Sequence, residues 1–124
     1  MSSPADRQYS KSHEWHKEEN GLIILGVTQF AVNALTDVTF AEMKGVGFKF
    51  ERGQPIGVVE SVKTTSDIYC AAPGEIVAVN EALINDPSLI NQDCYGKGWL
   101  CKIKPSGPLS GTLDAKAYDA ENPL

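Results

Sequence analysis

Lys63 lies between two short runs of residues that favour β-strands, and this placement suggests a chemical role for it. The run Ile56–Ser61 is almost entirely β-branched or small, and the run Thr65–Tyr69 again favours a strand. The two runs predict a hairpin with Lys63 near its tip. A lysine at such a tip has no surrounding pocket that would lower its pKa by burial, so it is a poor catalytic amine. It is well placed to be held and acylated by another enzyme, although an ordinary polar hairpin tip is the simpler alternative.

Histidine and cysteine side chains could bind a metal or provide a nucleophile, but neither set has the spacing that such a site requires. The zinc pattern H-E-x-x-H places two histidines four residues apart on a helix, whereas His13 and His16 are three apart in a segment without helical periodicity. Cys70, Cys94 and Cys101 contain no C-x-x-C pair. We therefore expect no metal site and no cysteine nucleophile paired with a histidine. We expect three reduced thiols, with Cys70 and Cys101 packed as small apolar side chains.

Length and composition describe one acidic domain. The 124 residues suffice for a single core but not for two domains, and 42% of them are hydrophobic. The 11 Lys and Arg residues, against 16 Asp and Glu residues, leave a net charge of −5. This balance argues against a nucleic-acid partner and suits partners with basic surfaces. No apolar run approaches the length of a membrane span, so we expect no membrane partner, and we expect a monomer.

Both ends of the chain are expected to be loosely ordered parts of this single domain, which spans residues 1–124. The first residues have neither an apolar stretch nor an arginine-rich amphipathic pattern. Together with Met1, this favours a bacterial or archaeal cytoplasm, although a mitochondrial matrix protein whose presequence has been removed would look the same. Towards the other end, only Leu113–Ala120 has weak helical character.

The segments that must position the hairpin are further short strands joined by turns. Asn20-Gly21 is typical of a type I′ turn between strands at 13–17 and 22–25. Thr28 is the predicted N-cap of a short helix, and Asp86 is the predicted N-cap of a helical turn with Pro87 at its first position. Other strands are predicted at 7–9, 37–43, 48–50, 75–79 and 99–104. Turns about every 6 to 12 residues favour a mainly β fold, either a β-sandwich or a flattened barrel.

Several motifs occur together around Lys63 and along the chain. Those nearest the lysine are Glu60-Ser61-Val62-Lys63, Ser66-Asp67-Ile68-Tyr69 and Gly74-Glu75-Ile76-Val77-Ala78-Val79-Asn80. Others are Ser12-His13-Glu14-Trp15, Gly26-Val27-Thr28-Gln29-Phe30-Ala31, Leu89-Ile90-Asn91 and Gly98-Trp99-Leu100. In order and spacing this set resembles the H protein of the glycine cleavage system, and the resemblance covers roughly residues 7–104. It implies a lipoyl-type β-sandwich of two antiparallel sheets with short peripheral helices.

The resemblance implies that Lys63 carries lipoate in amide linkage and that the protein is a shuttle rather than an enzyme. The lipoyl arm would accept an aminomethyl group from a pyridoxal-phosphate glycine decarboxylase and present it to a tetrahydrofolate-dependent aminomethyltransferase. An FAD-dependent dihydrolipoamide dehydrogenase would then reoxidise the arm. The alternative is a lipoyl relay protein that donates lipoyl groups to other complexes. A biotin carrier is disfavoured, because that family flanks its lysine with methionines, whereas Val62 and Thr64 flank Lys63.

Five further residues receive roles from the resemblance. Glu60, three residues before the lysine, and Gly74, eleven after it, would help the lipoate-attaching enzyme to recognise the hairpin. Ser12, Glu14 and Asp67 would line a cleft that shelters the loaded arm, where a carboxylate would favour an arm that ends in a protonated amine. The alternatives are that Gly74 is needed only for a turn and that the two acids are solvated edge charges.

The chain departs from the family pattern at a few turns. Thr36 stands where the family usually has a glycine, and Ala71 and Cys94 stand where it usually has prolines. Gly107-Pro108 and Gly111 predict a C-terminal helix that is shorter than the family's. These departures put the turn geometry and the tail in question, and none of them involves Lys63.

Overall fold

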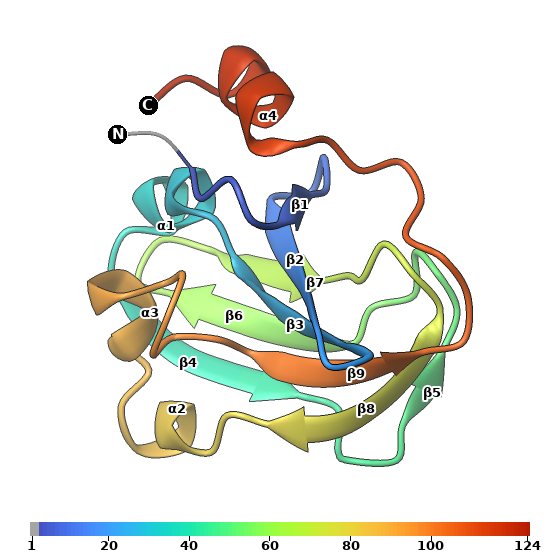
Figure 1. Ribbon diagram of the computed structural model, residues 1–124. Helices are drawn as coiled ribbons and strands as arrows, with labels where there is room; N and C mark the ends of the chain where they lie inside the picture. Colours follow the sequence, from blue (N-terminus) through green and yellow to red (C-terminus); the bar gives the residue numbers. More distant parts are fainter. Residues whose placement is uncertain (1–2) are drawn as a thin grey trace.

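Two antiparallel sheets face each other in the computed structural model, which describes residues 3–124 (Figure 1). The larger sheet has the strand order β1-β2-β3-β9-β8-β5, and the smaller has the order β4-β6-β7. The strands are β1 Gln8–Tyr9, β2 Glu14–Glu19, β3 Leu22–Val27, β4 Val38–Met43, β5 Lys49–Phe50, β6 Gly57–Ser61, β7 Thr65–Ile68, β8 Gly74–Val79 and β9 Cys101–Pro105. The helices are α1 Gln29–Leu35, α2 Ala82–Asn85, α3 Leu89–Gln92 and α4 Ala115–Glu121. This architecture confirms the predicted mainly β fold of two antiparallel sheets with short peripheral helices.

The main core fills the space between the sheets. Alternate residues of each strand point inwards, as the period of two in a β-strand requires. The buried members from the larger sheet include Ile23, Leu25, Ile76 and Ile103, and those from the smaller sheet include Val38, Ala41, Val59 and Ile68. The predicted apolar runs therefore become the inner faces of the two sheets.

Two local predictions are confirmed by backbone geometry. Asn20 and Gly21, with φ angles of 54° and 79°, connect β2 to β3 in the type I′ manner, and Glu19 pairs with Leu22. Thr28 caps α1, because its hydroxyl oxygen accepts a hydrogen bond from the N–H of Ala31 at 3.2 Å. Both features depend only on residues close in sequence.

The predicted N-cap at Asp86 is wrong. Asp86 ends the short helix α2, which the sequence analysis did not predict, and α3 begins only at Leu89. The Asp86 carboxylate accepts a hydrogen bond from the hydroxyl of Ser88 instead of from a backbone N–H at the start of α3. Pro87 lies in the turn between the two helices rather than at the first position of α3.

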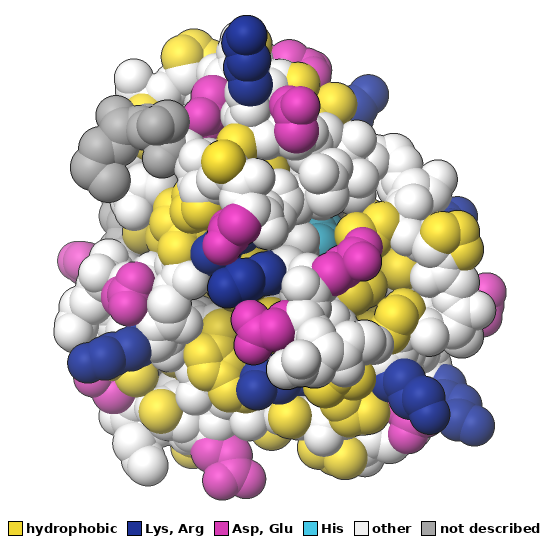
Figure 2. All heavy atoms as spheres, viewed as in Figure 1, with side chains coloured by type: hydrophobic (Ala, Val, Ile, Leu, Met, Phe, Trp, Pro, Cys, Tyr) yellow, Lys and Arg dark blue, Asp and Glu magenta, His cyan; other side chains and the backbone are white. Residues whose placement is uncertain are grey.

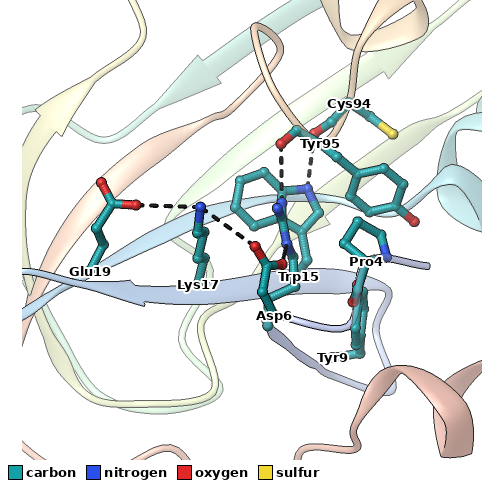
Figure 3. Close-up of polar contacts among 9 residues, drawn as sticks. Pro4, Asp6, Tyr9, Trp15, Lys17, Glu19, Cys94 and Tyr95 are labelled. Carbon is teal, nitrogen blue, oxygen red and sulfur yellow. Dashed lines mark hydrogen bonds and ion pairs between the residues drawn. The ribbon is translucent and has the colours of Figure 1, made fainter.

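Trp15 is buried, but it lies in a second apolar cluster rather than in the main core. It packs there with Tyr9, Ala115 and Tyr118. The indole N–H of Trp15 donates to the carbonyl of Cys94 at 2.9 Å (Figure 3). The guanidinium carbon of Arg7 lies 4.6 Å from the centroid of the indole ring. This cluster lies at the edge of the larger sheet, where α4 packs against β1 (Figure 1).

The two ends of the chain, which we expected to be loosely ordered, contact each other. The backbone N–H and the hydroxyl of Ser3 donate to the Asp119 carboxylate at 3.0 and 2.6 Å. Tyr9 and Leu113 exchange two backbone hydrogen bonds of 2.8 Å each. α4 extends over Ala115–Glu121, close to the range with helical character, and Asp114 caps it by accepting from the N–H of Ala117.

The surface carries charges of both signs. Figure 2 shows Lys and Arg side chains next to Asp and Glu side chains, with apolar atoms between them. Within residues 3–124, no helix combines the length and the apolar character needed to cross a bilayer.

Candidate functional site

The predicted hairpin is present, and Lys63 lies at its tip. β6 and β7 pair antiparallel with Glu60 opposite Thr65, and residues 62–64 connect them. The Lys63 side chain is exposed, and its amine has no ion-pair or hydrogen-bond partner within residues 3–124. The amine is therefore accessible to an enzyme that approaches the tip.

Ser61 holds the backbone of the tip in place. Its hydroxyl oxygen accepts hydrogen bonds from the N–H groups of Lys63 at 3.2 Å and Thr64 at 3.0 Å, and its O–H donates to the Thr64 carbonyl at 3.0 Å. The N–H of Val62 donates to the Asp37 carbonyl at 3.1 Å. A fixed turn thus presents a lysine side chain that is free to move.

A groove of ≈ 330 Å³ begins beside this tip. It runs between the edge strand β7, the start of β2 and helix α1. Its apolar lining consists of Val27, Phe30, Ala31, Ala34, Leu35 and Ile68. Its other lining residues are Ser12, His13, Glu14, Thr64, Ser66, Asp67 and Tyr69. The structure therefore brings together Ser12, Glu14 and Asp67, three of the residues singled out from the sequence.

Glu14 is buried in the wall of the groove, so it is not the solvated edge charge that the alternative predicted. Its side chain is 1% exposed. Oε1 accepts hydrogen bonds from the hydroxyls of Ser10, at 2.6 Å, and Ser12, and Oε2 accepts from the N–H of Tyr69 at 3.0 Å. Burial raises the pKa of this carboxyl, and the donors from Ser10, Ser12 and Tyr69 partly oppose that rise.

Asp67 differs from Glu14, because it is exposed. It lies on β7 opposite Val58, four residues after Lys63. Its carboxylate is therefore the accessible acid at the rim of the groove, as expected of an edge charge, while also being close to the tip.

Gly74 lies away from the groove. It is the first residue of β8, and Figure 1 shows β8 beginning at the opposite end of the sandwich from the connection between β6 and β7. A Cβ at this position would lie 2.6 Å from the carbonyl oxygen of Lys104 and 2.9 Å from Cγ2 of Ile103. Gly74 has no positive φ. Close approach of β9, rather than a turn, is thus the structural requirement for glycine here.

Glu60 is half-buried on β6, between Phe40 of β4 and Thr65 of β7. It lies on the same hairpin as Lys63, so it is near enough to the tip to be contacted together with it.

His16 and the three cysteines are buried and contribute to packing and hydrogen bonding within the fold. Nε2 of the buried His16 accepts a hydrogen bond from the N–H of Ala71 at 3.0 Å. Cys70, Cys94 and Cys101 are buried free thiols, so the packing expected for Cys70 and Cys101 is confirmed. No three His, Cys, Asp or Glu side chains converge in a metal-binding arrangement in the described part of the chain.

Comparison with known proteins decides the family. A sequence profile described as "Glycine cleavage H-protein" matches residues 7–121. The chain belongs to this family. Glycine cleavage system H proteins of Symbiobacterium thermophilum and Thermus thermophilus are 51% and 48% identical to it over 119 and 120 residues. These alignments cover 94% and 95% of this chain, and 93% and 94% of the relatives.

A solved H protein has the same fold. The crystal structure of a glycine cleavage system H protein from Mycobacterium marinum superposes with a TM-score of 0.93 at 38% sequence identity. The alignment covers 98% of this chain and 100% of that chain. The H-protein resemblance expected from the motifs is confirmed, together with the lipoyl-type β-sandwich that it implied.

Two residues of the groove region were missed as site candidates. His13 was considered only as a metal ligand or as the partner of a cysteine, although it stands inside the motif Ser12-His13-Glu14-Trp15. Tyr118, on α4, has its hydroxyl 2.7 Å from Nδ1 of His13. No local sequence signal indicates that contact, because it joins residues 105 positions apart.

Proposed function

We propose that this member of the H-protein family is the lipoyl-carrying shuttle of a glycine cleavage system, with lipoate in amide linkage to Nζ of Lys63. The observation that carries the proposal is an exposed lysine, at the tip of a turn fixed by Ser61, beside a groove that begins at Thr64. Acylation needs an accessible amine, and a carrier needs a tethered group that can reach other active sites.

The groove suits a long acyl arm. Its apolar lining from α1, with Phe30 and Leu35, offers contact to a hydrocarbon chain. Ser12, His13 and Asp67 provide polar contacts in the same groove. When attached, the lipoyl group supplies a cyclic disulfide that accepts a carbon fragment with two electrons and is later restored by thiol–disulfide exchange.

The partners follow from that chemistry and from the family. A pyridoxal-phosphate glycine decarboxylase supplies an aminomethyl group, a tetrahydrofolate-dependent aminomethyltransferase removes it, and an FAD-dependent dihydrolipoamide dehydrogenase restores the disulfide. A lipoate-attaching enzyme recognises the hairpin, with Glu60 as a charge near the tip. In this scheme the protein is a substrate of its partners and catalyses none of these steps, and Gly74 supports recognition by keeping the sandwich correctly packed.

Within the chain, the groove residues position the arm and limit its exposure to water. Burial of Glu14 between Ser10, Ser12 and Tyr69 fixes one wall. Asp67 places a negative charge at the rim, which favours an arm that ends in an ammonium group over a neutral one. A partly exposed pair of this kind contributes about 0.2–1 kcal/mol.

The experiment is lipoylation of the purified chain by a lipoate-attaching enzyme, followed by intact mass measurement. Lys63→Arg keeps the charge but removes the acylable amine, so it should gain no lipoyl mass. Lys97→Arg, at another exposed lysine, is the matched control and should be lipoylated like the parent. Lipoylation of the Lys63→Arg variant would refute the assignment. Glycine decarboxylation that does not depend on the lipoylated chain would favour the relay alternative.

A further inference from the structure

The backbone just before Lys63 is anchored to a residue outside the hairpin. The N–H of Val62 donates to the carbonyl of Asp37 at 3.1 Å, and Asp37 immediately precedes β4. The Val62 side chain is 70% exposed, so apolar packing contributes little to holding this residue in place. The Asp37 carbonyl therefore ties residue 62, one position before the lysine, to the rest of the smaller sheet.

A single side-chain amide holds the backbone on both sides of Asp37. Nδ2 of Asn91 donates to the carbonyl of Thr36 at 2.7 Å, and Oδ1 of Asn91 accepts from the N–H of Val38 at 2.9 Å. Asn91 lies on the short helix α3, far along the chain from the segment that it binds. The helix thus fixes the two peptide groups that flank the α-carbon of Asp37.

One of these peptide groups connects Asn91 directly to the tip of the hairpin. The N–H of Val38 and the carbonyl of Asp37 belong to the same planar peptide, in which the two groups point in opposite directions. Asn91 accepts from the N–H end, and the carbonyl end accepts from Val62. Because the peptide is rigid, the contact with Asn91 sets the direction in which the Asp37 carbonyl points.

The backbone around Asp37 is irregular, so it depends on such contacts. Thr36 has φ 64° and ψ −134°, a conformation that β-branched residues rarely adopt. The pairing of β4 with β6 then shifts by one residue between Val38 and Phe40. Conformations of this kind persist where the surrounding structure holds them. Asn91 provides that support at residues 36 and 38.

We propose that Asn91 is a positioning residue for the acylation of Lys63. Its amide fixes the peptide between residues 37 and 38, the Asp37 carbonyl then fixes the backbone of Val62, and the turn presents Lys63 in one direction. The inference rests on the proposed carrier function. An enzyme that acylates the lysine must bind the turn in one conformation, and a turn already held in that conformation loses less freedom on binding. Loss of the anchor should therefore raise the KM for the chain more than it lowers kcat.

The first test is the kinetics of lipoylation by a lipoate-attaching enzyme, at a temperature where all variants are folded. Asn91→Ala should lower kcat/KM about fivefold, the equivalent of one net hydrogen bond, mainly through KM. Asn80→Ala is the matched control, because the Asn80 amide also donates to two backbone carbonyls, those of Lys97 and Trp99, at 2.8 Å each. It should lose stability and keep the parent's kinetics. Equal kcat/KM values for the parent and both variants would overturn the inference.

The second test measures the anchor itself by amide hydrogen exchange. The Val62 amide should exchange faster in Asn91→Ala than in the parent, whereas Asn80→Ala should leave it unchanged relative to the amide of the buried Val59, which reports on global stability. Asn91→Asp keeps an acceptor for the N–H of Val38 but has no donor for the Thr36 carbonyl, so its effect should be intermediate.

The Asn91→Asp variant carries both comparisons if Asn91→Ala does not fold. Unchanged relative exchange of the Val62 amide in the folded Asn91 variants would overturn the inference. A parent chain that gains no lipoyl mass at Lys63 would overturn the proposed function and this inference together. A lipoylated parent whose kinetics do not depend on Asn91 would overturn this inference alone, so the two failures are distinguishable.

Discussion

The carboxylate of Glu14 accepts a hydrogen bond from the backbone N–H of Tyr69, with 3.0 Å between Oε2 and N. Two residues along β2, Nε2 of His16 accepts from the N–H of Ala71 at the same distance of 3.0 Å. β2 belongs to the larger sheet, and Tyr69 follows β7 of the smaller one. The side chains of Glu14 and His16 therefore accept hydrogen bonds from the backbone N–H groups that follow β7, as the carbonyls of a neighbouring strand would. These two hydrogen bonds connect the two sheets beside the groove.

Glu14→Gln should destabilise the fold while leaving Lys63 open to lipoylation. The amide has one acceptor oxygen, so it cannot accept from Ser10, Ser12 and Tyr69 together, and one buried donor loses its partner. We expect a loss of about 1–3 kcal/mol in the free energy of unfolding, measured with urea. Asp67→Asn, on the exposed rim, is the control and should change stability by less than about 0.5 kcal/mol. Equal effects of both substitutions would contradict the role given to Glu14.

His16 should make stability depend on pH. Burial lowers its pKa from 6.5 to about 4. Between these pH values the unfolded chain binds a proton at His16 and the folded chain does not, so stability should fall as the pH drops from 6.5 to 4. The full contribution is about 3 kcal/mol. The raised pKa of Glu14 acts in the opposite sense. The Glu14 carboxyl keeps its proton to a higher pH in the folded chain than in the unfolded chain, so its contribution to the free energy of unfolding falls as the pH rises above 4.5.

A comparison with His16→Gln separates these two effects. The glutamine oxygen can still accept from the N–H of Ala71, but the side chain does not titrate. Urea unfolding of both proteins at several pH values between 4 and 7 should show a smaller rise of stability with pH in the variant. Parallel curves for parent and variant would show that His16 does not carry the effect.

Thr36→Gly should stabilise the protein. Thr36 follows α1 with φ 64° and ψ −134°, a conformation that a β-branched residue adopts at a cost of about 1–3 kcal/mol. Glycine relieves that strain and loses about 0.5–1 kcal/mol to its greater freedom in the unfolded chain, so we expect a net gain of about 1 kcal/mol. Thr39→Gly on β4 is the control, and it should destabilise. A lower urea midpoint for Thr36→Gly would rule this account out.

Gly74→Ala and Glu60→Ala should separate packing from recognition. A Cβ at position 74 would meet the carbonyl oxygen of Lys104 at 2.6 Å, so Gly74→Ala should lower stability by about 1–3 kcal/mol. Once folded, that variant should still be lipoylated at an ordinary rate. Glu60→Ala should leave stability nearly unchanged and slow lipoylation. Both variants are measured in a ligase assay and by thermal unfolding. A stable Gly74→Ala variant that is lipoylated slowly, or a destabilised Glu60→Ala variant that is lipoylated at the parent's rate, would contradict these roles.

The three thiols should be unreactive in the folded protein. Burial raises the pKa of Cys70 to about 11 and of Cys94 to about 12, and it also raises the pKa of Cys101. Because the thiolate is the reactive form, a thiol reagent at pH 8 should label the native chain slowly. In denaturant without reductant, all three should be labelled. A titration that finds only one thiol would indicate a disulfide.

Local features of this protein could be predicted from the sequence because neighbouring residues produce them. The type I′ turn at Asn20-Gly21 requires two residues that tolerate positive φ, and Thr28 caps α1 through an N–H three residues away. The strands around Lys63 follow from β-branched runs and from the period of two. The motifs around Lys63 likewise indicated the family before any contact was known.

The tertiary structure decided which of these residues are buried and which meet. Glu14 and Asp67 are both acids in the sequence, yet only folding gives one of them three buried donors and leaves the other exposed. The contact between His13 and Tyr118 spans 105 positions, and no local pattern encodes its partner. The local sequence at Asp86 is typical of an N-cap, but in the folded chain Asp86 ends α2 and α3 begins only at Leu89. Burial and long-range hydrogen bonds depend on how the two sheets and the chain ends pack, so they exist only in the folded molecule.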